Sequence, residues 1–380
     1  MTTTINNEHK KLNVPNLRFP EFQGEWEESI IGEMFDLYSG NTPSRLNKEH
    51  FKGAVNWISS GELKEHYIYS SKEQISEEAA KNLKLLPVGT FVIAIYGLEA
   101  EGVRGTGSIT QEPSTISQAC MSFIPKGVIG NEFLYSWYKK HGNVIGIRYA
   151  QGTKQQNLSY DILEKFKIAY PNTKEQEKLN RFISLIDERI ATQNKIIDKL
   201  QSLIKGIAQK IVRSNKPNVR LYECVECSSS TLQESEVYEQ GAYPVYGANG
   251  IVGYLDNYNT EGEAVYIIKD GSGVGTVSYV TGKCSATGTL NTLQAKDGYS
   301  LQYLYYLMKV FNFEPYKTGM AIPHIYFKDY GKTKVFCPSY TEQLRYARLL
   351  SAIDSKLSAE KHIQTSLSLQ KQYLLRQMFI

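Results

Sequence analysis

Two long segments of the chain carry apolar residues at the 3.5-residue spacing that is typical of coiled coils. In the first segment, alternating steps of four and three residues from Leu179 to Ile211 reach ten positions, and nine of them are Leu or Ile, the exception being Gln193. A seam this long predicts a helix that buries its apolar stripe against another helix. The apolar positions of the first seam are Leu179, Ile183, Ile186, Ile190, Ile197, Leu200, Ile204, Ile207 and Ile211.

The second segment repeats the first at an offset of 167 residues. Pro171 and Pro338 each precede a Glu-Gln pair by four residues, and the shifted seam is apolar at both ends but polar at its centre. Two such helices in one chain can each bury their seam on the other. A helix of about 38 residues is roughly 57 Å long at 1.5 Å per residue. The apolar positions of the second seam are Leu350, Ile353, Leu357, Leu367, Leu374 and Met378.

A further repeat marks the start of each half of the chain. Residues 15–18 read Pro-Asn-Leu-Arg and residues 217–220 read Pro-Asn-Val-Arg, an offset of 202 residues. The two halves therefore begin and end alike but differ by 35 residues in between. This layout predicts four regions, namely a globular domain at 1–150, a long-helix region at 151–214, a shorter globular domain at 215–320 and a second long-helix region at 321–380.

Both globular regions alternate short strand-like runs with turn-rich stretches. β-branched and aromatic residues dominate these runs, which is the composition typical of strands. The runs lie at 90–96, 121–124, 264–268 and 276–280. A helical pattern closes each region, at 132–138 and 302–308, and we interpret its aromatic residues as core. The expected fold class is α+β, with two globular domains joined by two long helices.

The distribution of charge follows the repeat. The 380 residues carry a formal net charge of +4. Counted by region, the two globular regions are acidic, at −2 and −4, whereas each long-helix region carries +5. The chain also contains 27 Tyr, a residue that suits recognition surfaces and strand-rich cores alike. The alternation of acidic and basic regions supports an internal duplication.

The sequence favours a reducing, membrane-free location. Five Cys are scattered along the chain, too few and too dispersed for a disulfide framework. No run of eighteen apolar residues occurs, and residues 1–12 are polar and lack the apolar core of a secretion signal. We therefore expect a cytoplasmic protein with no membrane partner.

Motifs of self-sufficient enzymes are missing from the sequence. It holds no Gly-x-x-x-x-Gly-Lys-Ser/Thr phosphate loop, and the glycine spacing at 271–275 does not fit a dinucleotide site. No two Pro are adjacent, which excludes the Asn/Asp-Pro-Pro-Tyr/Phe motif of amino-methylating enzymes, and no Pro precedes Asp as in many metal-dependent nucleases. Cys224 and Cys227 form a lone C-x-x-C pair, whereas structural zinc takes four ligands, so two ordinary thiols are favoured over zinc. We expect no catalytic and no metal-binding residues.

Several segments, in order, resemble the specificity subunits of type I restriction-modification enzymes. The first is Leu-Arg-Phe-Pro-Glu-Phe-x-Gly-x-Trp at 17–26, followed by Ser-Gly-Asn-Thr-Pro-Ser at 39–44. The others are Gly-Thr-Lys-Gln-Gln-Asn-Leu at 152–158 and the Pro-x-x-x-Glu-Gln sequence that starts each long helix. No single motif is decisive, but their order and duplication are specific, and the resemblance spans essentially the whole chain.

The resemblance implies an architecture and a set of partners. Two target recognition domains would each read one half of a bipartite target in double-stranded DNA, and the two long helices would pair antiparallel and set the spacer. Two methylation subunits would dock on the helices, and restriction subunits with motor activity would join them. The chain itself would bind no cofactor, since S-adenosylmethionine, ATP and magnesium would be used by these partners.

Residue type and loop position nominate the DNA contacts. Arg suits guanine edges, and Asn or Gln suits adenine edges, in the major groove. For the first domain the candidates are Ser44, Arg45, Trp57, Tyr96, Arg104, Thr106, Lys154, Gln155 and Gln156. For the second domain they are Tyr246, Asn249, Lys269, Ser272, Lys283 and His324.

Two other readings stay open at this level. A coiled-coil adaptor would share the helices but would not need two different domains rich in Gly and Tyr. A fused methylase-nuclease is disfavoured because the methylation motif is missing. The acidic charge of the globular regions also means that basic residues must cluster on one face, or that the methylation subunits supply much of the contact to DNA phosphates.

Overall fold

A computed structural model describes residues 12–152, 154–319 and 321–380 of the chain. These residues form two compact units. Unit 1 contains residues up to Ala191 together with Thr365–Ile380, and unit 2 is Thr192–Gln364. Each unit therefore holds one globular domain and part of each long helix. Each part of a long helix shares a core with its neighbouring globular domain.

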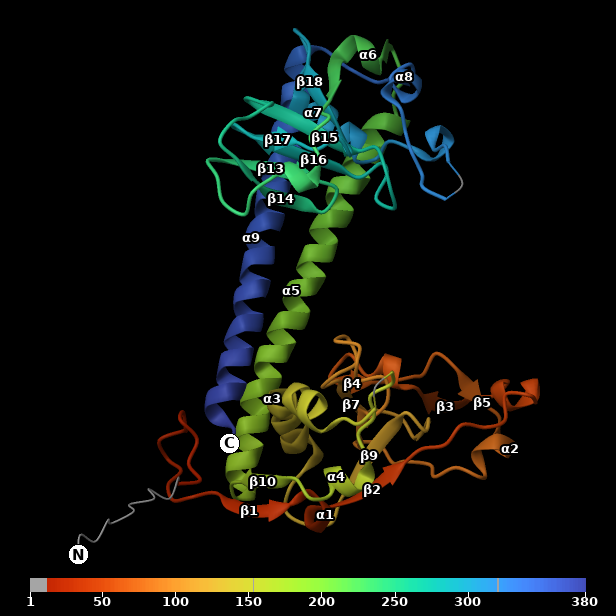
Figure 1. The fold of residues 1–380 in the computed structure, drawn as a ribbon, viewed down its shortest axis with the longest axis vertical. Coiled ribbons are helices and arrows are strands. Elements are labelled where there is room, and N and C mark those ends of the chain that lie inside the picture. Colours follow the sequence, from red (N-terminus) through yellow and green to blue (C-terminus); the bar gives the residue numbers. More distant parts are fainter. Residues whose placement is uncertain (1–11, 153, 320) are drawn as a thin grey trace, which may run out of the picture. The chain divides into compact units, whose positions relative to one another are not determined.

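The two long helices are α5 (Thr173–Arg213, 41 residues) and α9 (Tyr340–Met378, 39 residues). They pack side by side (Figure 1). Within unit 2 they run antiparallel, because Gln193 of α5 contacts Glu360 of α9, whereas Ile211, further along α5, lies beside Leu350, further back along α9. The expected pair of long helices is therefore present in an α+β fold.

The positions of both expected seams lie away from solvent. In unit 1, Leu179 and Ile183 share a core with Leu374 and Met378. In unit 2, the shared core includes seam positions from both helices, Ile204, Ile211, Leu350 and Leu357. The polar centre of the seam is paired as well, because the Gln193 amide donates to the Glu360 carbonyl at 3.0 Å and to its carboxylate. The remaining seam positions are buried or half-buried, namely Ile186, Ile190, Ile197, Leu200, Ile207, Ile353 and Leu367.

Unit 1 is built on a five-stranded sheet of order β2-β9-β6-β7-β4, a three-stranded sheet β5-β3-β8 and the antiparallel pair β1-β10 (Figure 1). The strands are β1 (Glu27–Ile30), β2 (Phe35–Ser39), β3 (Val55–Ile58), β4 (Tyr67–Ile68), β5 (Gln74–Ile75), β6 (Phe91–Ala94), β7 (Gly107–Thr110), β8 (Ser114–Ile116), β9 (Cys120–Pro125) and β10 (Lys167–Tyr170). The shorter helices are α1 (Ile31–Met34), η1 (Lys48–Phe51), η2 (Ser60–Glu62), α2 (Glu77–Ala80), α3 (Asn131–Tyr149) and α4 (Tyr160–Leu163).

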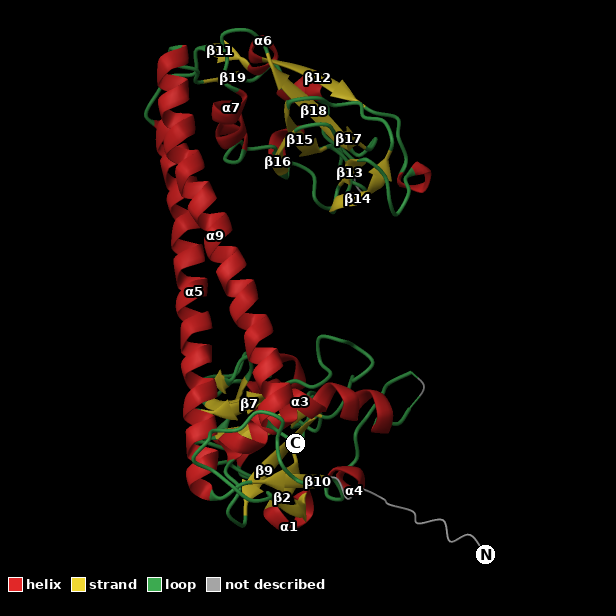
Figure 2. Cartoon of the chain, turned by 90° about the vertical axis from the view of Figure 1, so that its left-hand side faces the viewer, coloured by secondary structure: helices red, strands yellow, loops and turns green. Residues whose placement is uncertain are grey.

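Unit 2 repeats this plan with fewer strands. Its main sheet has the order β12-β18-β15-β16, beside a three-stranded sheet β14-β13-β17 and the pair β11-β19 (Figure 2). The strands are β11 (Val219–Arg220), β12 (Val225–Ser229), β13 (Tyr243–Gly247), β14 (Gly250–Leu255), β15 (Glu263–Ile268), β16 (Val277–Thr281), β17 (Ser285–Ala286), β18 (Leu290–Ala295) and β19 (Lys334–Val335). The shorter helices are α6 (Leu221–Cys224), η3 (Glu234–Glu236), α7 (Leu301–Met308), η4 (Glu314–Tyr316) and α8 (Phe327–Tyr330).

The central strand of each main sheet is buried on both faces. In β6, Phe91 and Ile93 enter the core that includes α3, whereas Val92 enters a second core against the smaller sheet. In β15, Val265 and Tyr266 divide in the same way between two cores. Because side chains alternate across a strand, a fully buried strand carries a continuous apolar run rather than an alternating one. This explains why these two runs stand out in the sequence.

A glutamine at the equivalent position connects the first turn of each long helix to its globular domain. Gln176 donates to the Pro171 carbonyl at 2.9 Å, and its amide oxygen accepts from Gly130 N, at the start of α3, at 3.3 Å. Gln343 donates to the Pro338 carbonyl at 2.9 Å and accepts from Ser300 N, at the start of α7, at 2.9 Å. The duplicated Pro-x-x-x-Glu-Gln sequence therefore joins each domain to its helix.

Candidate nucleic-acid interface

Each unit pairs a glycine-rich loop with a turn that lies far along the chain. In unit 1, the loop after β6 receives the turn at 151–157 through two backbone hydrogen bonds, Leu98 N to Gln156 O (3.1 Å) and Leu158 N to Ile95 O (2.9 Å). In unit 2, the loop after β15 receives the turn at 318–324 through Gly271 N to Pro323 O (3.0 Å) and Ile325 N to Lys269 O (2.9 Å). We call these two assemblies the loop pairs.

A glycine is required at the same place in both turns. Gly152 has a φ of 115° and Gly319 a φ of 88°, backbone conformations that L side chains rarely adopt. A Cβ at Gly152 would lie 2.1 Å from the Gln155 carbonyl oxygen, and one at Gly319 would lie 2.3 Å from the Ile322 carbonyl oxygen. The conformation of the turn, rather than contact with a ligand, therefore accounts for this repeated glycine.

Three candidates of the first domain lie together in its turn. Lys154 and Gln155 are exposed, and Gln156 is half-buried. The Gln156 backbone N–H donates to the Glu99 carboxylate at 2.9 Å and lowers the pKa of that carboxyl. The turn thus presents one cation and one amide side chain on a backbone held from both sides.

Three further candidates hold the glycine-rich loop of unit 1. Arg104 donates to the carbonyls of Leu98 (2.9 Å) and Glu99 (3.2 Å). The Thr106 hydroxyl donates to the Val103 carbonyl at 2.7 Å. Tyr96 is half-buried, and its backbone forms a bridge with Asn157. These contacts give the three residues a structural role in shaping the loop.

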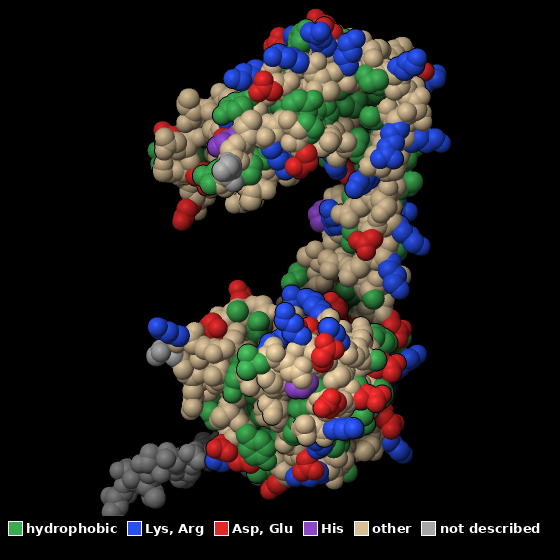
Figure 3. Space-filling view, turned by 90° about the vertical axis from the view of Figure 1, so that its right-hand side faces the viewer, with side chains coloured by type: hydrophobic (Ala, Val, Ile, Leu, Met, Phe, Trp, Pro, Cys, Tyr) green, Lys and Arg blue, Asp and Glu red, His purple; other side chains and the backbone are tan. Residues whose placement is uncertain are grey.

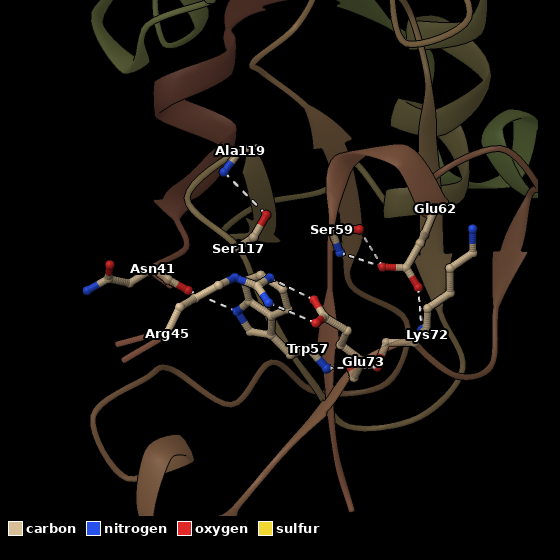
Figure 4. Close-up of polar contacts among 10 residues, drawn as sticks. Asn41, Arg45, Trp57, Ser59, Glu62, Lys72, Glu73, Ser117 and Ala119 are labelled. Carbon is tan, nitrogen blue, oxygen red and sulfur yellow. Dashed lines mark hydrogen bonds and ion pairs between the residues drawn. The ribbon is translucent and has the colours of Figure 1, made fainter. Parts of the chain in front are cut away.

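Arg45 and Trp57 lie elsewhere in unit 1, beside Glu73 and Asn41 (Figure 4). Ser44, the residue before Arg45, is exposed. The Arg45 guanidinium forms a bidentate pair with Glu73 at 2.8 and 2.7 Å, and these hydrogen bonds lower the pKa of the Glu73 carboxyl. Trp57 is only 3% exposed, and its indole N–H donates to the Asn41 carbonyl at 3.0 Å. Its ring therefore belongs to the core, where Phe51 packs against it edge-on.

In unit 2 the loop pair gathers three candidates. The His324 ring lies 2.5 Å from the Asp270 carboxylate, with both side chains about one-third exposed. Ser272 is exposed in the same loop, and Lys269 is half-buried at its start. The contact between His324 and Asp270 links the two halves of this loop pair through side chains, whereas the loop pair of unit 1 uses Glu99 and a backbone N–H.

The other candidates of unit 2 occupy the smaller sheet and its neighbourhood. Asn249 is exposed in the turn between β13 and β14. Tyr246 is half-buried, and together with Thr276 it lines a hollow of about 470 Å³ that reaches the glycine-rich loop. Lys283 is exposed and lies 4.7 Å from the Tyr258 ring centroid, and a hydrogen bond to the Tyr258 hydroxyl raises the pKa of its amine.

A cluster of ionisable residues in unit 1 escaped the sequence analysis. The His66 ring lies 2.9 Å from Glu132 and 3.5 Å from Asp187, and it is stacked between Tyr67 and Tyr135 at 4.0 Å from each centroid. Burial lowers the pKa of His66, but hydrogen bonds to the two carboxylates outweigh burial and raise it above 6.5. The imidazolium is thus favoured. The Ile-Asp pair at 186–187, which recurs at 353–354, is the sequence feature that could have indicated this cluster.

Two cations complete this cluster. Lys371 of α9 lies 2.5 Å from Asp187. Burial raises the pKa of Asp187, but hydrogen bonds from His66 and Lys371 outweigh it, so the pKa falls below 3.8. Lys139 lies over the Tyr135 ring, and burial together with nearby Lys371 lowers its pKa to about 8. Charges from four chain segments therefore neutralise one another where α3 meets the long helices.

The C-x-x-C pair does not converge on a common site. Cys224 Sγ lies 3.7 Å from Cys337 Sγ, whereas Cys227 contacts the Ser228 carbonyl. Among the residues that the structure describes, no group of three or more His, Cys, Asp and Glu side chains is arranged so that it could hold a metal ion. Across 12–152, 154–319 and 321–380, no helix combines the length and apolar character needed to cross a membrane.

Known proteins resemble the chain in sequence. It is 22% identical over 365 residues to the Type I restriction enzyme EcoprrI specificity subunit of Escherichia coli, with 86% of each chain covered. It is 29% identical over 185 residues to the MjaIX specificity subunit of Methanocaldococcus jannaschii, covering 46% of this chain and 42% of the relative. It is 28% identical over 229 residues to the EcoR124I/EcoR124II specificity subunit of Escherichia coli, covering 59% of this chain and 53% of the relative. The chain thus spans about half the length of the last two relatives.

Solved structures and a family model agree with this likeness. The crystal structure of the type I restriction-modification S subunit from M. genitalium matches with a TM-score of 0.64 at 19% identity, covering 97% of this chain and 99% of that one, which shows the same fold. A family model described as Type I restriction modification DNA specificity domain matches residues 23–202 and again residues 216–369. These two matches include most of the chain and contain both loop pairs. The chain therefore belongs to the DNA specificity family of type I restriction-modification systems and carries two copies of its domain.

Proposed function

We propose that the chain recognises a bipartite sequence in double-stranded DNA, with the loop pair of each unit reading one half. The observation that carries this proposal is that the same loop pair is built twice but presents different side chains. The turn of unit 1 exposes Lys154 and Gln155, whereas unit 2 exposes Ser272 and, on a neighbouring turn, Asn249. Two equal frames with unlike contact residues suit a target whose halves differ in sequence.

We further propose that the long helices set the spacer between the half-sites. At 1.5 Å per residue, a helix of 41 residues is about 61 Å long. The Gln193–Glu360 contact supports a fixed register, because a buried polar pair within an apolar seam disfavours sliding by a heptad. A change in helix length by whole heptads should therefore change the spacer and leave the half-sites unaltered.

Exposed features of the same helices suit the docking of methylation subunits. Figure 3 shows Lys and Arg side chains along one face of the helices. Apolar side chains are also exposed on the same two helices, namely Leu185, Leu203, Leu349, Ile363, Leu369 and Tyr373. In a cytoplasmic complex these subunits would use S-adenosylmethionine to methylate adenine, and restriction subunits would use ATP and magnesium. The methylation subunits would also supply phosphate contacts that the acidic globular regions lack.

The proposal is tested by mapping methylated adenines. The chain is co-expressed with its cognate methylation subunit in cells without other adenine methylation, and the genome is sequenced with detection of N6-methyladenine. We expect one bipartite motif that disappears when the specificity gene is deleted. Complex formation without any DNA-dependent gel shift would favour the adaptor reading. Methylation by the purified chain alone would favour the fused enzyme.

A further inference from the structure

The main sheets of the two units differ at one edge. In unit 1, β4 pairs in parallel with β7, where Ile109 N donates to the His66 carbonyl at 2.8 Å and Gln111 N to the Ile68 carbonyl at 2.9 Å. In unit 2, the order ends at β16, and no described strand pairs with its outer side. The first domain therefore completes its sheet with a segment that the second domain lacks, in agreement with the 35 extra residues between the repeated ends.

The register of the sheets aligns these two edges. In unit 1, Phe91 of the central strand faces Ile109, and in unit 2, Val265 faces Tyr279. Tyr279 thus occupies the position of Ile109, and Thr281, which is exposed, occupies the position of Gln111. The backbone N–H groups that bind β4 in unit 1 have counterparts on an unpaired edge in unit 2. An exposed edge of this kind is a template for a strand from another chain.

β4 has a second role in unit 1, because it positions His66, the residue just before it, against the carboxylates of Glu132 and Asp187. The starts of α3 and α7 align through Gly130 and Ser300, which bind the equivalent glutamines. In this alignment Gln302 corresponds to Glu132, and Tyr305 corresponds to Tyr135. Both tyrosines carry a lysine over the ring at equivalent positions, Lys139 at 5.2 Å and Lys309 at 5.1 Å, which supports the alignment.

Unit 2 leaves the equivalent of the His66 position open. A hollow of about 260 Å³ lies beside Tyr279 of β16. Its lining also includes Gln302, Tyr305 and Tyr306 of α7, and Asp354 with three serines of α9. Asp354, the repeat counterpart of Asp187, accepts a hydrogen bond from the Tyr306 hydroxyl at 3.3 Å. Burial and a hydrogen bond with the Glu263 carboxylate raise the pKa of the Tyr279 hydroxyl. The hollow therefore offers a carboxylate and aromatic faces.

We propose that β16 and this hollow form a docking site for an extended segment of the methylation subunit. The segment adds a strand along Tyr279 and Thr281 and places a basic side chain against Asp354, as β4 and His66 do within unit 1. Main-chain hydrogen bonds provide affinity in such strand addition, and a charged pair in a half-buried pocket provides specificity. The partner's identity rests on the proposed function, whereas the chemistry of the segment follows from unit 1.

The test measures binding of the full chain to the purified methylation subunit. We expect Asp354→Asn to weaken the affinity about tenfold, which is the effect of losing about 1.4 kcal/mol. Asp297→Asn removes the same charge from an exposed position in the turn between β18 and α7 and should leave the affinity unchanged. Gln302→Glu recreates the second carboxylate of unit 1 and should tighten binding.

The strand is tested separately. Thr281→Pro removes an edge N–H that faces outward and should weaken binding at least fivefold, whereas Thr281→Ala should not. Hydrogen exchange of the complex should show protection of residues 277–281 relative to the free chain. Formation of the complex with unprotected β16 amides and unchanged affinity of Asp354→Asn would overturn this inference while leaving the proposed function intact. Absence of any complex with the methylation subunit would instead contradict the proposed function.

Discussion

Units 1 and 2 share a frame but differ in what fills the space between the main sheet and the long helices. In unit 1, His66, Lys371 and two carboxylates form a compensated cluster, in which the His66 ring is stacked between two tyrosines. In unit 2, Asp354 lines an open hollow. The two units share this frame because glutamines and glycines recur at equivalent positions in both copies. The comparison teaches that duplication repeated the junctions, while the strands that differ between the units decided whether the repeated aspartate lies in a charged cluster or lines an open hollow.

The largest difference is expected when the two aspartates are removed. Asp187→Ala should reduce the free energy of unfolding by about 3 kcal/mol, because Lys371 loses its carboxylate partner in a partly buried place and His66 keeps Glu132 but loses the second carboxylate. Asp354→Ala, at the repeat position, should cost less than about 1 kcal/mol, because it breaks one hydrogen bond at an open hollow. Urea denaturation of both variants measures this, and equal losses would contradict the contrast between the units.

The repeated glycines should instead behave alike. Gly152→Ala and Gly319→Ala should each cost about 2 kcal/mol, because a Cβ clashes with a backbone carbonyl at a positive φ in both turns. Gly61 is a matched control, since a Cβ there would meet nothing within 4 Å and its φ is not positive, so Gly61→Ala should be nearly neutral. Thermal unfolding compares the three variants. A loss confined to one turn would show that the loop pairs are not equivalent.

The two loop pairs should differ in the DNA half-site that each of them reads. Gln155→Ala should relax one half-site and Ser272→Ala the other, each reducing discrimination about tenfold, which corresponds to the loss of one polar base contact. Sequencing of methylated sites in cells that express each variant measures the relaxation. Exposed Gln23 is a control outside both loop pairs. Relaxation of both half-sites by either variant would contradict the assignment of one half to each unit.

The smallest expected effect is a pH dependence that belongs to unit 1. The pKa of His66 is raised in the folded chain, so its contribution to stability is fully present below about 6.5 and is lost as the pH rises through the folded value. The pKa of Lys139 is lowered to about 8, so stability recovers as the pH rises from about 8 toward 10.5. Each group changes stability by at most about 1.4 kcal/mol per pH unit.

Unfolding experiments between pH 6 and 10 should therefore show a shallow minimum in stability. His66→Gln should remove the descending part, while Lys139→Met should remove the ascending part. His362, exposed on α9, provides a control, and His362→Gln should retain the wild-type profile. A flat wild-type profile would contradict the charge assignment of the cluster.

The sequence alone revealed the features that depend on local periodicity. The heptad spacing, the offset of 167 residues and the paired Pro-x-x-x-Glu-Gln sequences were sufficient to predict two long helices and an α+β fold. The buried runs that became β6 and β15 were visible for the same reason, since a strand buried on both faces is apolar throughout. Such patterns persist because each position of a helix or strand faces the same surroundings at a fixed interval.

The tertiary structure alone decided how individual polar and aromatic residues are used. Trp57 is a core residue because Asn41 and Phe51 reach it from other segments, and Arg104 is bound to carbonyls of its own loop. The His66 cluster joins residues as far apart as 66 and 371, and no local pattern announces such a meeting. Burial and charge pairing depend on which distant segments come together, and that is set by packing rather than by spacing along the chain.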